Sequence, residues 1–321
     1  MNRRAFVSGL GATFVGPFRA GAQQRNIPKV GVLWPNPPAT FEDLRAGLID
    51  LGYVEGRNIT FEYRWVQGKL DQLPQFADEL VKSKVDVIIT LAPQAAIAVK
   101  QATQTIPIVV VAIGDPVASG LVSNLAHPGG NLTGTTRMLS EMSAKHVELL
   151  AQVVPSLSRL VVLWNPENSS HTPALKAAQV TARSLGIHVR PMEVRNLTDL
   201  ESVFTFVARD KPDGLLFLAD PVFFINLRRV ADLIAANHLP AVSNFVEFAR
   251  LGGLIGYAAS LPEEFHRAAS YVDKILKGAK AGDLPIQQPT KFDLFINAKT
   301  ARDLGLTIPP SLLLRADQVI E

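Results

Sequence analysis

Cysteine is absent from the 321-residue sequence. The chain therefore cannot form disulfide bonds, thiolate metal sites or a cysteine nucleophile. It also lacks the N-terminal cysteine that would carry a lipid anchor. The six histidines are scattered along the chain, with no pair at the spacing of metal ligands. We therefore expect no metal site.

A long hydrophobic run is missing as well. The apolar stretch from Ala5 to Phe18 is broken by glycines and is too short to span a bilayer, which takes about 20 residues. It follows the basic pair Arg3-Arg4 and precedes Ala20-Gly21-Ala22, a small-residue pattern that signal peptidase cleaves. We expect residues 1–22 to be a signal peptide of the Sec or the twin-arginine kind, cleaved near Ala22. Its removal would leave a periplasmic protein without a direct membrane anchor.

The chain has no excess of charge beyond this N-terminal segment. Lys and Arg number 32 and Asp and Glu 29, and the first 22 residues hold three arginines and no acid. The remaining chain is therefore neutral, which gives no basis for binding nucleic acid. It is roughly 300 residues long, more than one hydrophobic core usually serves, so two lobes are expected.

Strand and helix patterns alternate along the chain in two similar series. The first series runs from the apolar stretch Val30 to Trp34 to the stretch Ile106 to Ile113. The second restarts at Arg159 to Trp164, and both opening strands end in Trp before a turn rich in Asn and Pro. Apolar strands that are joined by helices are typical of a parallel sheet covered on both faces.

These patterns predict an α/β fold of two Rossmann-like lobes, each with a parallel sheet. We assign residues 27–139 plus 254–285 to lobe 1 and residues 140–253 plus 286–321 to lobe 2. Because both lobes use the C-terminal part, the chain would cross several times between them. Such a multi-crossing hinge suits closure of one lobe on the other.

In open parallel sheets a ligand lies beyond the carboxyl ends of the strands, where helix N-termini direct N–H groups at it. The candidates in such loops are Trp34, Asn36, Ala92, Pro93, Gln94, Asp115, Thr135, Arg137, Asn165, Asp220, Phe223, Asn244 and Tyr257. The aspartates could equally cap helices, the asparagines could be turn residues, and the aromatic residues could pack in a core. Arg137 could hold a carboxylate or form a surface ion pair. A carboxylate at the Pro93-Gln94 turn with a cation near Asp220 or Asp115 would make an amino-acid site.

Motifs of catalysis are missing. No Gly-x-Gly-x-x-Gly follows the first strand, and no Gly-x-Ser-x-Gly occurs. The turn Pro128-Gly129-Gly130-Asn131 lacks the Lys-Ser/Thr of a phosphate-binding loop. No helix-turn-helix precedes the first lobe, so a DNA-binding regulator is not supported. We expect a binding protein that has neither catalytic residues nor a cofactor.

Short motifs spread in order over the chain carry a family resemblance. They are Leu51-Gly52-Tyr53-Val54-Glu55-Gly56-Arg57-Asn58-Ile59, Ile106-Pro107-Ile108-Val109, Gly114-Asp115-Pro116-Val117, Pro128-Gly129-Gly130-Asn131-Leu132-Thr133-Gly134, Gly252-Gly253-Leu254, Ile275-Leu276-Lys277-Gly278-Ala279-Lys280, Gln288-Pro289-Thr290-Lys291-Phe292, Leu304-Gly305-Leu306-Thr307-Ile308-Pro309-Pro310 and Leu314-Arg315-Ala316-Asp317-Gln318-Val319-Ile320. With these motifs the chain resembles ABC-transporter substrate-binding proteins of the tryptophan/tyrosine-type family, whose lobes have the type I periplasmic binding fold.

The resemblance implies that a monomer captures a small solute in the periplasm and delivers it to an ABC permease in the inner membrane. It implies an aromatic amino acid or a related aromatic or organic carboxylate as the ligand. Such proteins often carry Gly, Ser or Thr after the third strand, where this chain has Leu91-Ala92-Pro93-Gln94. Fewer hydroxyl groups are then available to a carboxylate there. A periplasmic sensor that presents its bound solute to a membrane receptor is the alternative.

Overall fold

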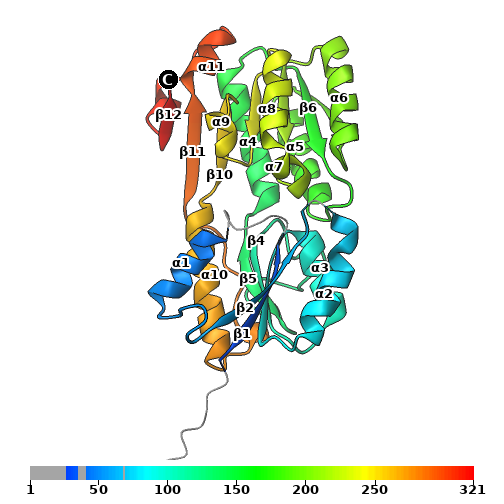
Figure 1. The fold of residues 1–321 in the computed structure, drawn as a ribbon. Coiled ribbons are helices and arrows are strands. Elements are labelled where there is room, and N and C mark those ends of the chain that lie inside the picture. Colours follow the sequence, from blue (N-terminus) through cyan, green and yellow to red (C-terminus); the bar gives the residue numbers. More distant parts are fainter. Residues whose placement is uncertain (1–26, 35–40, 68) are drawn as a thin grey trace, which may run out of the picture.

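The computed structural model describes residues 27–34, 41–67 and 69–321. The expected signal peptide and the candidate residue Asn36 lie outside these described residues. The described chain forms two α/β lobes, each built around one sheet, and the lobes lie end to end (Figure 1). This arrangement confirms the predicted fold class. Within the described ranges, no helix is long and apolar enough to cross a membrane.

The first lobe holds a five-stranded parallel sheet with the strand order β2-β1-β3-β4-β5. Its strands are β1 (Lys29–Trp34), β2 (Thr60–Trp65), β3 (Val87–Leu91), β4 (Ile108–Ile113) and β5 (Leu132–Thr136). One face is covered by α1 (Glu42–Asp50), α10 (Leu261–Leu276) and η3 (Ala281–Asp283), the other by η2 (Leu70–Gln72), α2 (Leu73–Lys82) and α3 (Pro93–Ala102). Every residue of β4 is buried, because helices pack on both faces.

The second lobe holds a seven-stranded sheet with the order β12-β11-β10-β9-β8-β6-β7. Its strands are β6 (Arg159–Trp164), β7 (His188–Glu193), β8 (Gly214–Phe217), β9 (Ala241–Ser243), β10 (Ile255–Ala259), β11 (Phe292–Asn297) and β12 (Gln318–Ile320). One face carries α4 (Leu139–Val153), α5 (His171–Ser184), α11 (Ala298–Asp303) and α12 (Pro310–Leu313). The other carries α6 (Leu197–Asp210), α7 (Pro221–Ile225), α8 (Leu227–Ala236) and α9 (Glu247–Arg250). Each sheet is thus enclosed between two apolar clusters.

The second sheet departs from the expected parallel order at β11, which runs antiparallel to β10. The reason is the path of the chain. After β10 the chain leaves the sheet at the end nearest the first lobe, forms α10 there, and returns at the same end (Figure 1). No helix carries it back to the far end of the sheet, so β11 must run the opposite way.

The same path changes the lobe assignment of residues 254–285. Helix α10 packs on the first sheet, as expected, but strand β10 pairs with β9 and β11 in the second sheet. The boundary near residue 254 therefore lies too early. The pairing places it after β10, close to residue 260.

The chain passes between the lobes after β5, after β10 and before β11. Two of these passages are joined by backbone hydrogen bonds. Gln287 N–H donates to the Gly134 carbonyl at 3.0 Å, and Thr136 N–H donates to the Gln287 carbonyl at 2.9 Å. Parallel segments tied in this way form the hinge region that the sequence predicts.

Gly134 lies where this hinge strand meets β4. Its φ is +140°, and a Cβ atom at this position would lie 1.9 Å from the Val110 carbonyl oxygen. A side chain is therefore excluded both by the backbone conformation and by direct contact with the neighbouring strand.

We predict that Gly134→Ala lowers the free energy of unfolding by about 3 kcal/mol or more, because the new methyl group would displace β4. Gly186→Ala is the matched control, since Gly186 also has a positive φ (+74°) but no atom within 4 Å of the added Cβ. It should cost about 1 kcal/mol. Urea denaturation of both variants checks the prediction, and equal losses would contradict the steric explanation.

Candidate functional site

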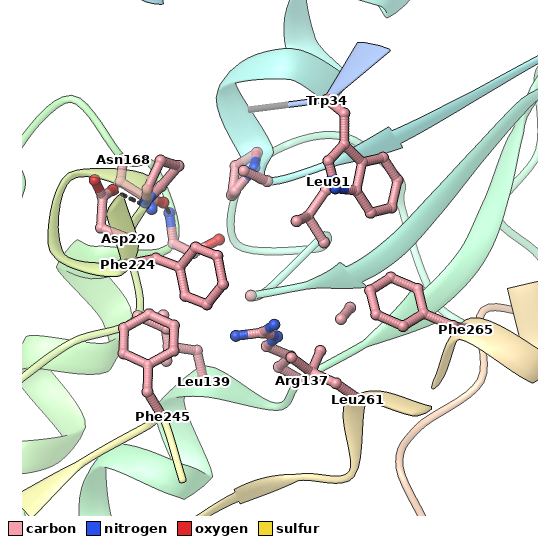
Figure 2. A pocket seen from close by; sticks show the side chains of 17 residues that line it. Trp34, Leu91, Arg137, Leu139, Asn168, Asp220, Phe224, Phe245, Leu261 and Phe265 are labelled. Atoms are coloured by element: carbon pink, nitrogen blue, oxygen red, sulfur yellow. Dashed lines mark hydrogen bonds between the residues drawn. The ribbon is translucent and has the colours of Figure 1, made fainter. Parts of the chain in front are cut away.

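A pocket lies between the lobes, at the carboxyl ends of their parallel strands (Figure 2). The end of β1 and the segments at and after the ends of β3, β4 and β5 form one side, and loops that follow β6, β8 and β9 form the other. The start of α10 completes the wall. The lining residues are Trp34, Leu91, Ala92, Pro93, Ala112, Gly114, Arg137, Leu139, Asn168, Ser170, Ala219, Asp220, Pro221, Phe224, Phe245, Leu261 and Phe265.

Aromatic rings from both lobes make most of the wall apolar. In the first lobe, the rings of Trp34 and Phe265 have centroids 5.7 Å apart. In the second, those of Phe224 and Phe245 are 5.5 Å apart. Figure 2 shows these two pairs on opposite sides of the pocket. Flat apolar groups bind well between such faces.

Arg137 projects its guanidinium group into the middle of this apolar space (Figure 2). The residue follows β5, and its N–H donates to the Ile113 carbonyl at 2.7 Å, which fixes the start of the side chain. Among the described residues its side chain forms no ion pair and no hydrogen bond, and its Nε atom is buried. Burial lowers the pKa of the guanidinium, and the carboxyl groups of Glu247 and Glu264 oppose that shift.

Glu264, on α10, is 1% exposed and has a buried Oε2 without a hydrogen-bond partner in the described chain. Burial raises the pKa of its carboxyl group, and a hydrogen bond with Thr135 opposes that shift. Thr135 also accepts a 2.8 Å hydrogen bond from Ala112 N–H. Neither Glu264 nor Thr135 lines the pocket, so both lie behind its surface.

Asp220 accepts four hydrogen bonds at the second-lobe side. Its Oδ1 accepts from Val222 N–H at 3.0 Å and from Asn165 Nδ2 at 3.3 Å. Its Oδ2 accepts from Asn168 Nδ2 at 2.9 Å and from Gln94 Nε2 at 3.3 Å. The carboxylate is 2% exposed and caps the N-terminus of α7. It organises its own surroundings and pairs with no cation in the described ranges.

His171 supports this polar cluster in a neutral form. Its Nδ1 accepts from Asn165 N–H at 2.8 Å, so its Nε2 carries the proton and donates to the Ala219 carbonyl at 3.0 Å. Burial lowers the pKa of the imidazole, while the Asp220 carboxylate opposes the shift. The ring therefore orients the loop after β6 without adding charge.

Polar contacts join the lobes across the pocket. Gln94 of the first lobe bonds Asp220 of the second, as described above. Ser170 Oγ accepts from Asp115 N–H at 3.0 Å and lies 3.0 Å from Ser119 Oγ. Gly114 allows this approach, because a Cβ added there would lie 2.6 Å from Ser170 Cβ. The lobes are thus in contact on this side of the pocket.

Non-glycine residues with positive φ gather at the first-lobe side of the pocket. They are Ala92 (φ +74°), Ala112 (+49°) and Met138 (+52°), which precedes Leu139 of the pocket wall. Such conformations cost roughly 1 kcal/mol or more each and persist only where the surrounding structure enforces them. The surrounding structure therefore holds the backbone beside the pocket in conformations that these residues would not adopt by themselves.

The structure places five of the sequence-predicted site residues on the pocket surface: Trp34, Ala92, Pro93, Arg137 and Asp220. Gln94 lies beside it, bonded to Asp220, with a buried Oε1 that has no partner in the described chain. Asn165 is fully buried under the polar cluster.

The remaining candidates do not line the pocket. Asp115 accepts from Ala118 N–H at 3.0 Å and holds its own turn. Phe223 packs in the core of the second lobe, and Asn244 is buried with both side-chain polar atoms unpaired in the described chain. Tyr257 lies within β10, where its ring stacks on Phe292.

Several lining residues were not predicted. Phe224 and Phe245 follow β8 and β9, so the rule of strand ends could have found them, as it could Asn168 and Ser170 after β6. Leu261 and Phe265 come from α10. This helix packs on the first sheet but follows β10, a strand of the second sheet. For these two residues the sequence carries no such signal. Across the described ranges, no group of three or more His, Asp or Glu side chains could hold a metal ion.

Residues 35–320 match the sequence model of the family described as ABC transporter substrate binding protein. A tyrosine-binding protein of Clostridioides difficile is 24% identical over 259 residues, which cover 81% of this chain and 74% of that protein. A conserved domain protein from Vibrio cholerae superposes with a TM-score of 0.85 at 28% identity, over 92% of this chain and all of the other. An ABC domain from Streptococcus pneumoniae in complex with L-Trp gives 0.86 at 24%, with the same coverage.

His146 links the candidate Tyr257 to the pH dependence of stability. Its ring is fully buried on α4, and its Nε2 donates to the Tyr257 carbonyl at 2.7 Å. Burial lowers the pKa of His146 to about 4. Between that value and the ordinary 6.5 the unfolded chain binds a proton that the folded chain does not.

We therefore predict that His146 makes the protein less stable as the pH falls from about 6.5 to about 4, by up to about 3 kcal/mol. Denaturation measured across this range should show a shallower decline for His146→Gln than for the unmodified protein. His188→Gln, which changes an exposed histidine, should leave the slope as it is. Parallel slopes for all three proteins would refute the assignment.

Proposed function

The chain belongs to the family of ABC transporter substrate-binding proteins, and from this premise we propose that it captures a small organic carboxylate with an aromatic or apolar body. It is the solute-binding component of an ABC transporter, a family of binding proteins rather than enzymes. The proposal adds the ligand class, closure of the two lobes on the ligand, and delivery to a permease for import.

One observation carries the ligand class. The guanidinium of Arg137 enters an apolar pocket and has no counterion among the described residues. A planar guanidinium matches a carboxylate with two parallel hydrogen bonds, which are stronger than bonds between neutral groups. A carboxylate would neutralise the buried charge and satisfy Nε in one step.

The body of the ligand is inferred from the rings around the arginine. Two aromatic pairs, one from each lobe, leave apolar faces on the pocket. The relatives support this assignment, since one is named for binding tyrosine and another was solved with L-Trp. We infer an aromatic amino acid or a related aromatic or organic carboxylate.

The contacts between the lobes support closure about the hinge. Ser170 and Gly114 meet across the pocket edge, and Gln94 reaches Asp220 from the opposite lobe. These groups can make contact only when the lobes are together. The strands that join the lobes leave room for the bending that opening requires.

Location and partner follow from the family and the N-terminal sequence. The segment of residues 1–22 supports export to the periplasm, where a monomer would dock on an ABC permease of the inner membrane. The mature chain is neutral overall, which supports no interaction with nucleic acid.

Arg137→Gln tests the ligand class. We expect it to weaken binding of 3-phenylpropanoate by about 100-fold, because two charge-assisted hydrogen bonds would be lost. Isothermal titration calorimetry measures the change. Arg209→Gln, an exposed arginine on α6, is the control and should bind as the unmodified protein does. Equal affinities of the two variants would reject Arg137 as the carboxylate site.

Gly114→Ala tests closure. The added methyl group would collide with Ser170 when the lobes meet, yet Gly114 has an ordinary φ that alanine can adopt in the open form. We expect about tenfold weaker ligand binding or more, and a larger radius of gyration with ligand by small-angle scattering. Ser119→Ala, which removes one hydroxyl but adds no bulk, should bind within about threefold of the unmodified protein. Unchanged affinity of Gly114→Ala would mean that closure does not require this contact.

A further inference from the structure

We propose that the pocket selects carboxylates that lack an α-ammonium group, such as arylalkanoates, over the amino acids of the same shape. The inference rests on the proposed function and narrows its ligand class. It is argued from which charged and polar groups on the pocket surface are free to bind a ligand and which are already hydrogen-bonded.

Among the described residues that line the pocket, only Arg137 and Asp220 carry a charge. The arginine is free to bind an anion, since no ion pair or side-chain hydrogen bond engages it within the described residues. An amino acid would bring an ammonium group as well, which carries three N–H donors and needs acceptors of opposite charge once it leaves water.

Asp220 is the acceptor to be expected for that ammonium group, but its capacity is taken. A carboxylate offers about four lone-pair sites. Val222 and Asn165 fill those of Oδ1, and Asn168 and Gln94 fill those of Oδ2. An incoming ammonium group would have to break these bonds, which also cap α7 and join the lobes.

The position of Asp220 is also unfavourable. In an amino acid the ammonium and carboxylate groups are bonded to the same carbon atom. A carboxylate on Arg137 would therefore place the ammonium group next to the guanidinium, which has the same charge. Figure 2 shows Asp220 and Asn168 together at one end of the pocket, apart from Arg137.

The other polar lining groups are also engaged. Asn168 Oδ1 accepts from Ser170 N–H at 3.1 Å, and Ser170 Oγ bonds Asp115 and Ser119. The unpaired Oε1 of Gln94 lies beside the pocket, but a neutral amide cannot balance an ammonium charge.

Two further carboxyl groups, those of Glu247 and Glu264, act on Arg137 electrostatically. Neither lines the pocket, and Glu264 is almost fully buried behind it, where burial favours its uncharged form. Their influence opposes the lowering of the Arg137 pKa by burial. They offer no acceptor to a ligand on the pocket side.

Matched ligand pairs test the inference on the unmodified protein. 3-Phenylpropanoate and L-phenylalanine share one body and differ by the ammonium group, and indole-3-propanoate and L-tryptophan form a second pair. By calorimetry at pH 7 we expect each propanoate to bind about tenfold more tightly or better than its amino acid. 2-Phenylethylamine, which has the ammonium group but no carboxylate, should not bind.

The outcomes separate this inference from the proposed function. If an amino acid binds as tightly as its propanoate, the selection is wrong while the carboxylate-binding function stands. If neither member of either pair binds, both proposals fail.

Arg137→Gln gives a second measurement. Without the fixed cation, the propanoate loses its partner and the amino acid is relieved of a like charge, so the two affinities should converge to within about threefold. An unchanged ratio in this variant would place the discrimination elsewhere and overturn the inference.

Discussion

A guanidinium group that is buried among apolar side chains without a counterion costs free energy of folding, and Arg137 carries that cost in the middle of the pocket. The rest of the site is arranged around it. Aromatic rings of both lobes line the space around it, and the carboxyl groups of Glu247 and Glu264 oppose the lowering of its pKa by burial. The strained backbone at Ala92, Ala112 and Met138 fits the same pattern, since conformations of this kind survive only where a scaffold enforces them. These local costs support the proposal that the surface is built for an anion.

The second lobe complements the first with an aspartate on the pocket surface whose hydrogen-bonding capacity is already taken. The sequence makes Asp220 a candidate partner for the cation of an amino acid, because it lies in a loop beyond the carboxyl end of a predicted strand. The folded chain instead surrounds it with four donors, one of which comes from the opposite lobe. The described residues of the pocket surface offer a ligand one unengaged positive charge and a set of apolar faces. We expect such a site to select ligands by their charge and shape more than by their hydrogen-bonding groups.

The fold was largely predictable, because continuous apolar strands between amphipathic helices permit few other arrangements. The antiparallel strand β11 was not, since its direction depends on where α10 packs, and that is decided far from β11 in the sequence. The rule of strand ends located the pocket but not every side chain in it. Phe223 and Phe224 are neighbours on the short helix α7, and a step of one residue turns the side chain by roughly 100°, from the core to the pocket. Sequence alone does not set that rotation. Leu261 and Phe265 were not predicted for a different reason. They reach the pocket from α10, which packs on the first sheet but follows a strand of the second.

The position of α10 also affects how the chain folds during its synthesis. Part of one face of the first sheet is covered by α10, whose residues are synthesised only after strands β6 to β10 of the second lobe. A growing chain therefore holds that apolar face open while the second lobe is still being made. The first lobe can therefore reach its final form only after α10 has been synthesised. A chain destined to pass through a membrane channel before folding would gain time from this arrangement.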